Sequence, residues 1–257
     1  MLLFKEMIVK EINTGKILTR SRISTKLYSL NPYVGCQHAC KYCYATFMKK
    51  FTRHKEEWGN FVDIKINAPF LLPKELQNSK RWEIMISSVT DPYQPLEEKY
   101  ALTRRCLEFL LKYQYPISIL TKSSLILRDI DLLTRFENIE VGLTITTDDE
   151  SIKKIFEPHS SSIHARLKAL ELLHNKGIKT YAFIGPILPL NIENLTEKLW
   201  RIVDFVYIDR MNYCDKIVNL YRKHGLENYL HPDYFYKIGQ ELRRLFNLKE
   251  IEVRILF

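Results

Sequence analysis

Short apolar runs alternate with amphipathic helical patterns along most of the chain. The runs are nearly continuous in Val, Ile, Leu and Phe, as in residues 117–120, ISIL, which is typical of strands buried on both faces of a parallel sheet. We therefore expect a strand at each run. The strand candidates are residues 29–35, 83–88, 117–121, 139–146, 180–184 and 205–209.

The segments between these strands show helical periodicity. Leu102, Cys106 and Phe109 begin a stripe that continues along one helical face, and residues 163–173 and 195–203 carry similar stripes. Strand and helix thus alternate about six times, and right-handed crossovers would close such units on one another. The pattern predicts an α/β fold, a partial (β/α)6 TIM-like barrel with N- and C-terminal extensions.

The segments outside these repeats give weaker signals. Residues 1–28 have no clear period and predict an extension packed on the outside. A strand around Ile64 precedes a short helix that Pro73 is expected to open. Residues 232–246 predict a helix and residues 251–257 an edge strand.

The composition is ordinary for a soluble globular protein, and the net charge is positive. Hydrophobic residues make up 46% of the 257 residues and charged residues 27%, and no apolar run is long enough to cross a bilayer. We therefore expect no membrane span. The five cysteines and the absence of a secretory pattern predict a reducing, cytoplasmic location. The net charge of +9 would suit nucleic acid or another anion, although it also fits a generally basic proteome. The densest basic run is residues 49–55.

Three cysteines, Cys36, Cys40 and Cys43, stand within eight residues. Soft thiolates this close together are typical of an iron–sulfur cluster or zinc. A disulfide framework is a poor alternative, because three cysteines cannot all pair among themselves. Structural zinc would need a fourth ligand, and no second pair with suitable spacing follows, which leaves only His38 inside the motif. Three ligands on a cluster would instead leave one iron open, which is a catalytic arrangement.

The motif CxxxCxYC resembles the signature of the radical S-adenosylmethionine (SAM) enzymes. The longer stretch SLNPYVGCQHACKYCYA, residues 29–45, is similar to the spore photoproduct lyase-like branch, often labelled DNA-repair photolyase. Further similar segments are SSVTDPYQPLE, ILTKS, TITT, IFEPHSSS, ARL and YAFIGPILP. The resemblance covers about residues 29–210 and implies one radical SAM domain over residues 1–257, with a C-terminal helical extension over residues 211–257.

The resemblance implies a [4Fe–4S] cluster on Cys36, Cys40 and Cys43, with SAM chelated to the fourth iron. It also implies a low-potential electron donor of flavodoxin or ferredoxin type. Reductive cleavage of SAM would give methionine and a 5′-deoxyadenosyl radical that abstracts a hydrogen atom from a substrate. The residues expected beside SAM are Tyr42, Ser88, Thr90, Lys122, Thr144, Thr146 and Arg166. Arg166 belongs to an element that also contains Glu157, and its alternative is a helix-surface ion pair with Glu171 or a neighbour.

Polar residues follow the predicted strands, where the active site of an α/β barrel lies. Such residues also cap helices, but together they predict one functional rim. The set is Ser88, Thr90, Asp91, Tyr93, Thr121, Lys122, Ser123, Thr144, Thr146, Asp148, Asp209, Asn212, Tyr213 and Cys214.

One departure from the family concerns the return of a hydrogen atom. The lyases carry a cysteine near the end of strand two, where this chain has Ser88, whose O–H bond is too strong for that role. The resemblance therefore supports the cofactor chemistry better than thymine-dimer repair. Tyr93, Tyr213 and Cys214 are the alternative candidates for quenching a radical, although Cys214 also fits a small half-buried residue. Cys106 is expected in the core.

The sequence is compatible with three functions. The first is a radical enzyme acting on a nucleic acid or nucleotide, favoured by the resemblance and the positive charge. The second is a radical enzyme that modifies a peptide or small metabolite. The third, from another class, is a non-catalytic metal protein that uses zinc or a cluster for structure or electron transfer.

Overall fold

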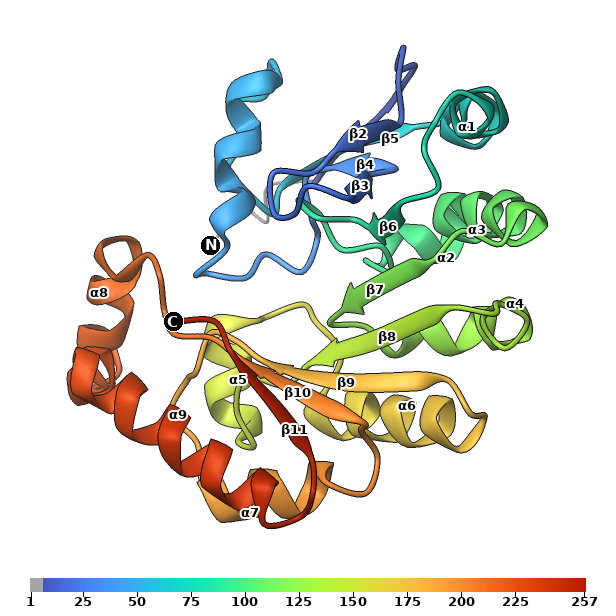
Figure 1. Cartoon of the computed structure of the whole chain (residues 1–257). Helices are drawn as coiled ribbons and strands as arrows, with labels where there is room; N and C mark the ends of the chain where they lie inside the picture. The colour runs from blue at the N-terminus through green and yellow to red at the C-terminus, as the bar shows by residue number, and fades with distance from the viewer. Residues whose placement is uncertain (1–6) are drawn as a thin grey trace. The chain divides into compact units, whose positions relative to one another are not determined.

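The computed structural model describes residues 7–257, whose contacts divide them into two compact units (Figure 1). Unit 1 contains residues 7–39, 45–121 and 125–140, and unit 2 contains residues 40–44, 122–124 and 141–257. The division falls inside the cysteine motif, so Cys36 belongs to unit 1 whereas Cys40 and Cys43 belong to unit 2. Whether the chain acts as a single domain stays a prediction.

The larger sheet of unit 1 has the strand order β7-β6-β3-β2. β3 (Leu27–Leu30), β6 (Glu83–Ile86) and β7 (Ile117–Thr121) run parallel, with Leu30 opposite Ile86, and β2 (Leu18–Arg20) is antiparallel to β3. These strands are rich in side chains that are fully buried, as expected for apolar runs in a covered sheet.

A second, smaller sheet in unit 1 has the order β1-β5-β4, formed by β1 (Ile8–Ile12), β5 (Phe61–Lys65) and β4 (Tyr33–Val34). The strand expected over residues 29–35 is therefore two strands, which separate at Asn31 and Pro32. Proline has no N–H to donate to a ladder, and its carbonyl accepts instead from the backbone N–H of Lys65 at 3.0 Å. The N-terminal extension supplies β1 and β2; residues 1–6 lie outside the described residues.

The helical elements of unit 1 flank these strands. Their bounds are η1 (Tyr44–Phe51), α1 (Ala68–Gln77), α2 (Leu96–Tyr100), α3 (Leu102–Tyr113), η2 (Ser124–Asp129) and α4 (Ile130–Leu133), where the first residue of each of the 3₁₀ helices η1 and η2 lies in unit 2. The expectation that Pro73 opens a helix is wrong. Pro69 occupies the first turn of α1, where a missing N–H costs nothing, and Pro73 lies inside the helix.

Unit 2 carries strands in the order β8-β9-β10-β11. They are β8 (Ile139–Thr144, the first two residues belonging to unit 1), β9 (Lys179–Ile184), β10 (Phe205–Ile208) and β11 (Glu252–Ile255). β10 runs parallel to both β9 and β11. The predicted edge strand at the C-terminus is thus β11.

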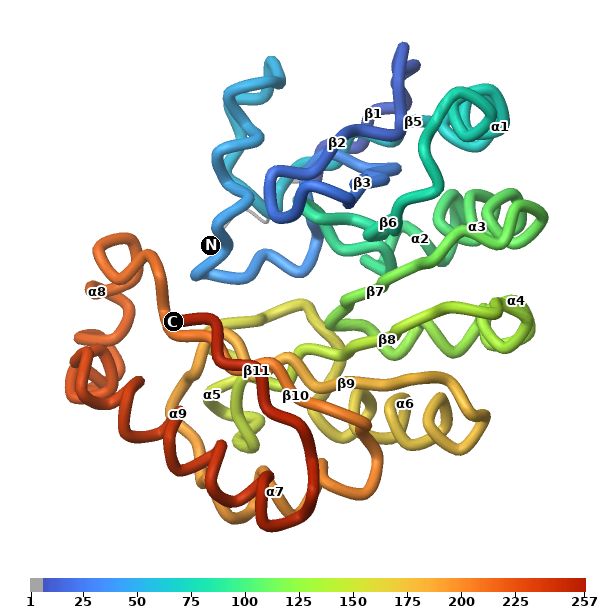
Figure 2. The backbone as a smooth tube through the Cα atoms, in the orientation of Figure 1, coloured from blue at the N-terminus to red at the C-terminus, as the bar shows by residue number. Residues whose placement is uncertain are grey.

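The helices of unit 2 are α5 (Glu150–Phe156), α6 (Ile163–Asn175), α7 (Ile192–Leu199), α8 (Cys214–Lys223), η3 (Glu227–Leu230) and α9 (Pro232–Asn247). α6 packs on β9, and α9 packs on both α7 and β11 (Figure 1). The backbone tube shows the chain leaving β10, passing through α8 and α9, and returning as β11 (Figure 2). α6 ends before Gly177, whose φ of +76° is the left-handed conformation that glycine adopts readily.

The predicted fold class is confirmed as α/β with a mostly parallel sheet. The six predicted strands correspond to β3, β6, β7, β8, β9 and β10, with helical segments between them. Over residues 7–257, the structure contains no helix with the length and apolar character needed to cross a membrane.

Candidate active site

The cysteine motif is built from tight backbone turns. In unit 1 the N–H of Ala39 donates to the carbonyl of Cys36 at 3.3 Å, and in unit 2 the N–H of Cys43 donates to the carbonyl of Cys40 at 3.2 Å. Ala39 has a φ of +52°, an uncommon conformation for a residue with a side chain. The motif is therefore a folded loop rather than an extended linker.

Two side chains of unit 1 hold the backbone on both sides of Cys36. Thr90 donates from its hydroxyl to the carbonyl of Gly35 at 2.5 Å. Gln94 is fully buried; its amide nitrogen lies 3.4 Å from the same carbonyl, and its amide oxygen accepts the N–H of Gln37 at 3.0 Å. The side chain of Gln37 in turn accepts the N–H of Leu96 at 2.5 Å. The segment SSVTDPYQPLE thus fixes the loop at its first cysteine.

Gly35 is required by the space around it. Its φ is +93°, and a Cβ placed there would lie 2.3 Å from the backbone carbonyl oxygen of Phe61. Only glycine can bring the chain this close to β5 in this conformation. The glycine of the sequence VGC therefore has a steric basis in this fold.

A second group of polar contacts lies beside this loop in unit 1. Nε2 of His38 is 3.3 Å from the carboxylate of Asp91, which also accepts the hydroxyl of Thr121 at 2.6 Å and the N–H of Tyr93 at 2.9 Å. Ser88 lies 3.4 Å from the side-chain nitrogen of Asn31. Of the two residues predicted at this strand end, Thr90 therefore contacts the residue before Cys36, and Ser88 contacts Asn31 earlier in the same segment.

In unit 2 the cysteine motif joins a buried ionic network. The hydroxyl of Tyr42 donates to the carboxylate of Glu157, which also accepts the hydroxyl of Thr146 at 3.0 Å. Glu157 and Arg166 are both fully buried, and Nη2 of Arg166 lies 2.5 Å from Oε2 of Glu157. Three predicted residues, Tyr42, Thr146 and Arg166, thus meet on one carboxylate.

The contacts of Arg166 are made within the protein. Besides Glu157, its guanidinium donates to the carbonyl of Ser161 at 2.9 Å, the carbonyl of Thr144 at 2.8 Å and the hydroxyl of Ser160. The alternative of a helix-surface ion pair is wrong, because Arg166 has no exposed surface. Its partner is the carboxylate at the end of α5 rather than Glu171. Its expected role as a direct SAM contact stays a prediction.

Lys122 is a second cation, besides Arg166, near Cys40. Its ammonium lies 3.4 Å from the hydroxyl of Thr144 and 5.7 Å from the centre of the Tyr42 ring. Burial raises the pKa of the Cys40 thiol to about 12, while the charges of Lys122 and Arg166 oppose that rise. Burial would also raise the pKa of Glu157, but Arg166, Lys122 and the Tyr42 hydroxyl outweigh it and lower the pKa to about 2.

The three candidate radical quenchers have different environments. Tyr93 is fully buried below the guanidinium of Arg128, 6.0 Å from the ring centre. Tyr213 is 45% exposed, and the ammonium of Lys216 lies 4.9 Å from its ring centre. Cys214 begins α8, partly buried, with its Sγ 3.3 Å from the carbonyl of Met211. Cys106 lies in the core on α3, as expected.

The residues of the motif suit an iron–sulfur cluster by their chemistry. Three soft thiols are held in a loop of tight turns, and in unit 2 two cations offset the negative charge that thiolate ligands would bring. Over residues 7–257, no three His, Cys, Asp or Glu side chains form a ready-made metal-binding group. The donor set fits the cluster, and its role as a ligand set stays a prediction.

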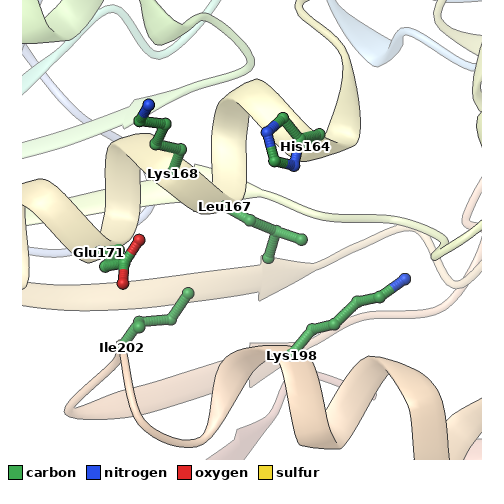
Figure 3. A pocket seen from close by; sticks show the side chains of 6 residues that line it. All are labelled: His164, Leu167, Lys168, Glu171, Lys198 and Ile202. Atoms are coloured by element: carbon green, nitrogen blue, oxygen red, sulfur yellow. The ribbon is translucent and has the colours of Figure 1, made fainter.

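An open groove of about 420 Å³ lies between α6 and the end of α7 (Figure 3). It is lined by His164, Leu167, Lys168, Glu171, Lys198 and Ile202. None of these side chains is among those that contact Cys40 or Tyr42, and we do not assign the groove to the active site.

The sequence model of the Radical SAM superfamily matches residues 30–205, more than half of the chain. The chain belongs to the radical SAM superfamily. It is therefore a radical SAM enzyme. An uncharacterised protein of Methanocaldococcus jannaschii is 39% identical over 226 residues, which cover 87% of this chain and 83% of that relative. The radical SAM Nalpha-GlyT isomerase of Pseudomonas phage M6 is 24% identical over 160 residues, 62% of this chain and 32% of the phage protein.

Solved structures of radical SAM enzymes share this fold. Spore photoproduct lyase with bound SAM and dinucleoside spore photoproduct has a TM-score of 0.69 at 13% identity, covering 98% of this chain and 82% of the lyase. Streptococcus suis SuiB bound to SAM has a TM-score of 0.58 at 13% identity, covering 89% of this chain and 46% of SuiB. The predicted likeness to the spore photoproduct lyase branch is thereby confirmed at the level of the fold.

Sequence reasoning missed the contacts that position the loop. Gln94 lies within a family-like segment but has no predicted role. Lys153 was also missed: it is buried on α5 and donates to the carbonyl of Ser160 at 2.5 Å, which extends the network around Glu157. Neither residue carries a motif that sequence alone would single out.

Proposed function

We propose that Cys36, Cys40 and Cys43 hold a [4Fe–4S] cluster and that the enzyme uses SAM to remove a hydrogen atom from a nucleotide or nucleic-acid substrate. The observation that carries the cofactor assignment is the buried network in unit 2, where the cysteine motif joins Glu157, Arg166 and Lys122 through Tyr42. When bound, the cluster and SAM supply reductive cleavage of the sulfonium and hydrogen-atom abstraction.

The chain's own residues would orient these groups. Thr90 and Gln94 fix the backbone at Cys36, and the Tyr42–Glu157 contact fixes the backbone between Cys40 and Cys43. Lys122 supplies a positive charge that suits the carboxylate of SAM, with Thr144 beside it. Arg166 acts through Glu157, because its donors are already used within the protein. In unit 1, Ser88, which follows β6, is a further residue that we propose as a SAM contact.

The nucleotide assignment rests on the charge of +9 and on the fold shared with the lyase whose structure holds a dinucleoside photoproduct. The alternative is a peptide substrate, supported by the structure of SuiB bound to its precursor peptide SuiA, which has a TM-score of 0.60 at 12% identity and covers 98% of this chain and 49% of SuiB.

We place the enzyme in the cytoplasm with a low-potential electron donor. Tyr213 and Cys214, unlike the buried Tyr93, retain the exposure that a residue needs to reach a product radical.

The cofactor assignment is tested by anaerobic reconstitution. The wild-type chain should retain about four irons and, on reduction, convert SAM to methionine and 5′-deoxyadenosine. A Cys36→Ala/Cys40→Ala/Cys43→Ala variant is the matched control and should retain neither property. A wild-type chain that takes up one zinc per chain and no iron would overturn the proposal.

The substrate class is tested by label transfer. Deuterated oligonucleotides, nucleosides and peptides are offered in turn, and deuterium is sought in 5′-deoxyadenosine by mass spectrometry. Transfer from an oligonucleotide or nucleoside supports the proposal. Transfer from peptides alone would replace it with the second function.

A further inference from the structure

Residues 45–55 of unit 1, which we call the aromatic–basic segment, expose rings and cations together. Phe47 is 43% exposed and Phe51 76% exposed, an unusual state for phenylalanine. The exposed cations Lys50, Arg53 and Lys55 stand among them. The segment begins two residues after Cys43 in the chain and includes most of the helix drawn in light blue in Figure 1.

The geometry of η1 places ring and charge in register. In a 3₁₀ helix the side chains at positions i and i+3 lie above one another, so Phe47 and Lys50 share one row. Phe51 follows directly at the end of the helix. Of the other apolar side chains in residues 45–51, Ala45 is buried and Met48 is partly buried.

Buried contacts hold the segment in place. His54 stacks on Phe61 of β5 with ring centres 4.1 Å apart. Its two ring nitrogens lie 2.8 Å from Asp63 and 3.0 Å from Glu56. The ammonium of Lys49 donates to the carbonyl of Lys55 at 2.8 Å, which closes the loop after η1. The exposed rings and cations therefore stand on a backbone that is already ordered, and a ligand need not organise it.

In the described part of the chain, the exposed cations of the segment are not held in ion pairs. Within residues 7–257, Lys50, Arg53 and Lys55 form no ion pair, and the nearby carboxylate of Glu56 is engaged by His54. Three cations without ion pairs to described residues, beside two exposed rings, match an anionic ligand with flat apolar faces. A single-stranded nucleic acid has both features, because its phosphates are spaced along a chain of unstacked bases.

Other anionic ligands fit less well. In a duplex the bases are stacked on one another and offer no face to Phe47 or Phe51. A membrane surface would require a broad apolar helix face, whereas the large apolar side chains exposed within residues 45–55 are these two rings, with cations between and beside them. The combination of rings and cations favours a single strand over both.

We propose that the aromatic–basic segment is a docking surface for single-stranded nucleic acid, on which Phe47 and Phe51 stack bases while Lys50, Arg53 and Lys55 contact phosphates. This inference rests on the proposed nucleic-acid substrate and adds where, and in which form, the strand binds. It requires no chemistry from the segment itself.

The test is equilibrium binding of a fluorescein-labelled oligothymidylate to the anaerobically reconstituted full-length enzyme, measured by anisotropy over a range of salt concentrations. The double substitution Phe47→Ala/Phe51→Ala should weaken binding about tenfold or more. Phe70→Ala is the matched control, because Phe70 is also exposed (68%) but lies on α1, and this variant should bind as wild type does.

The charge contribution is read from the salt dependence. The triple substitution Lys50→Gln/Arg53→Gln/Lys55→Gln should lower the slope of log affinity against log salt by about 2, because each phosphate neutralised on a single strand contributes roughly 0.7 to that slope. The control Lys74→Gln/Lys80→Gln/Lys112→Gln removes the same charge from exposed positions of unit 1 and should leave the slope near the wild-type value. Circular dichroism confirms that each variant is folded.

Several outcomes would overturn the inference. They are equal weakening by the test and control variants, equal affinity for the strand paired with its oligoadenylate complement, and tighter binding to vesicles of phosphatidylglycerol and phosphatidylcholine. The same wild-type preparation separates this inference from the proposed function. Cleavage of SAM without oligonucleotide binding defeats only the docking surface, whereas oligonucleotide binding without iron or SAM cleavage defeats only the cofactor assignment.

Discussion

The hydroxyl of Tyr42 donates a hydrogen bond to the carboxylate of Glu157, which joins the cysteine motif to a residue 115 positions further along the chain. Glu157 is at the same time the buried partner of Arg166. One carboxylate therefore links the residue between two predicted cluster ligands to the core of unit 2. The stability of this network can be tested apart from the chemistry.

Replacing Glu157 with glutamine should destabilise the protein strongly. The substitution preserves size and a hydrogen-bond acceptor but leaves the guanidinium of Arg166 buried without a counter-charge, a loss that typically costs about 3–5 kcal/mol. The free energy of unfolding in urea measures the effect. Glu241→Gln is the control, because its pair with Arg244 is on the surface and should contribute nothing measurable. Equal effects of the two substitutions would contradict the buried-pair assignment.

Stability should also depend on pH through Glu157. Burial favours the protonated form, but Arg166, Lys122 and Tyr42 outweigh burial and lower its pKa from 4.5 to about 2. The unfolded chain therefore binds this proton more readily than the folded chain does. The stabilisation by ionised Glu157 is complete above about pH 4.5 and is lost as the pH falls towards 2. Urea unfolding over this range should show a decline that is smaller in Glu157→Gln, and identical declines would refute the assignment.

Removing the charge of Lys122 should weaken SAM binding. The ammonium lies beside Thr144 and the Tyr42 ring, and a charged hydrogen bond to a carboxylate contributes roughly 1.5–3 kcal/mol, so Lys122→Met should raise the Kd at least about tenfold. Equilibrium dialysis with labelled SAM on reconstituted enzyme measures it. Lys168→Met makes the same change on the groove between α6 and α7 and should leave the Kd unaltered (Figure 3).

Gln94→Ala should loosen the loop at Cys36. The substitution deprives the buried N–H of Gln37 of its acceptor, which costs about 1–3 kcal/mol of stability, and it removes one of the two side chains that hold the Gly35 carbonyl. We expect less iron to be retained after reconstitution and desalting. Gln240→Ala, at an exposed position on α9, is the control. Full iron retention by Gln94→Ala would show that the loop does not depend on this side chain.

Alanine at Gly35 should be tolerated far less well than alanine at Gly225. Both glycines have positive φ, which costs alanine roughly 1–2 kcal/mol. Around Gly225 the space is open, whereas at Gly35 the new Cβ would also lie 2.3 Å from the carbonyl oxygen of Phe61, so the backbone must shift. Thermal unfolding of the two variants measures the difference. Similar losses would mean that the approach of Gly35 to β5 is not maintained in solution.

The sequence predicts the repeating part of the fold well, because period and burial are local properties. The apolar runs at β7 and β9 and the stripe along α3 each carry their own signal. The strands in residues 29–35 are harder to predict, because the chain breaks at Pro32 and β3 and β4 belong to different sheets. Sheet membership depends on pairing with β5 and β6, which lie far along the chain.

For the candidate site, residue identities were easier to predict than contacts. The cysteines stand out by spacing, and Tyr42, Thr146 and Arg166 by resemblance to the family. That these three converge on Glu157 depends on how β8, α5 and α6 fold together, which no local pattern encodes. For the same reason, the hold of Gln94 on the chain at Cys36 could not be predicted: a glutamine has no spacing rule.

The guanidinium of Arg166 donates in several directions from one flat group, to Ser161, Thr144, Ser160 and Glu157. A lysine has a single nitrogen at the end of a flexible stem and cannot span these acceptors together. The substitution Arg166→Lys is therefore not conservative at this position. Anyone redesigning this part of the protein must treat positions 157 and 166 as one unit and replace both or neither.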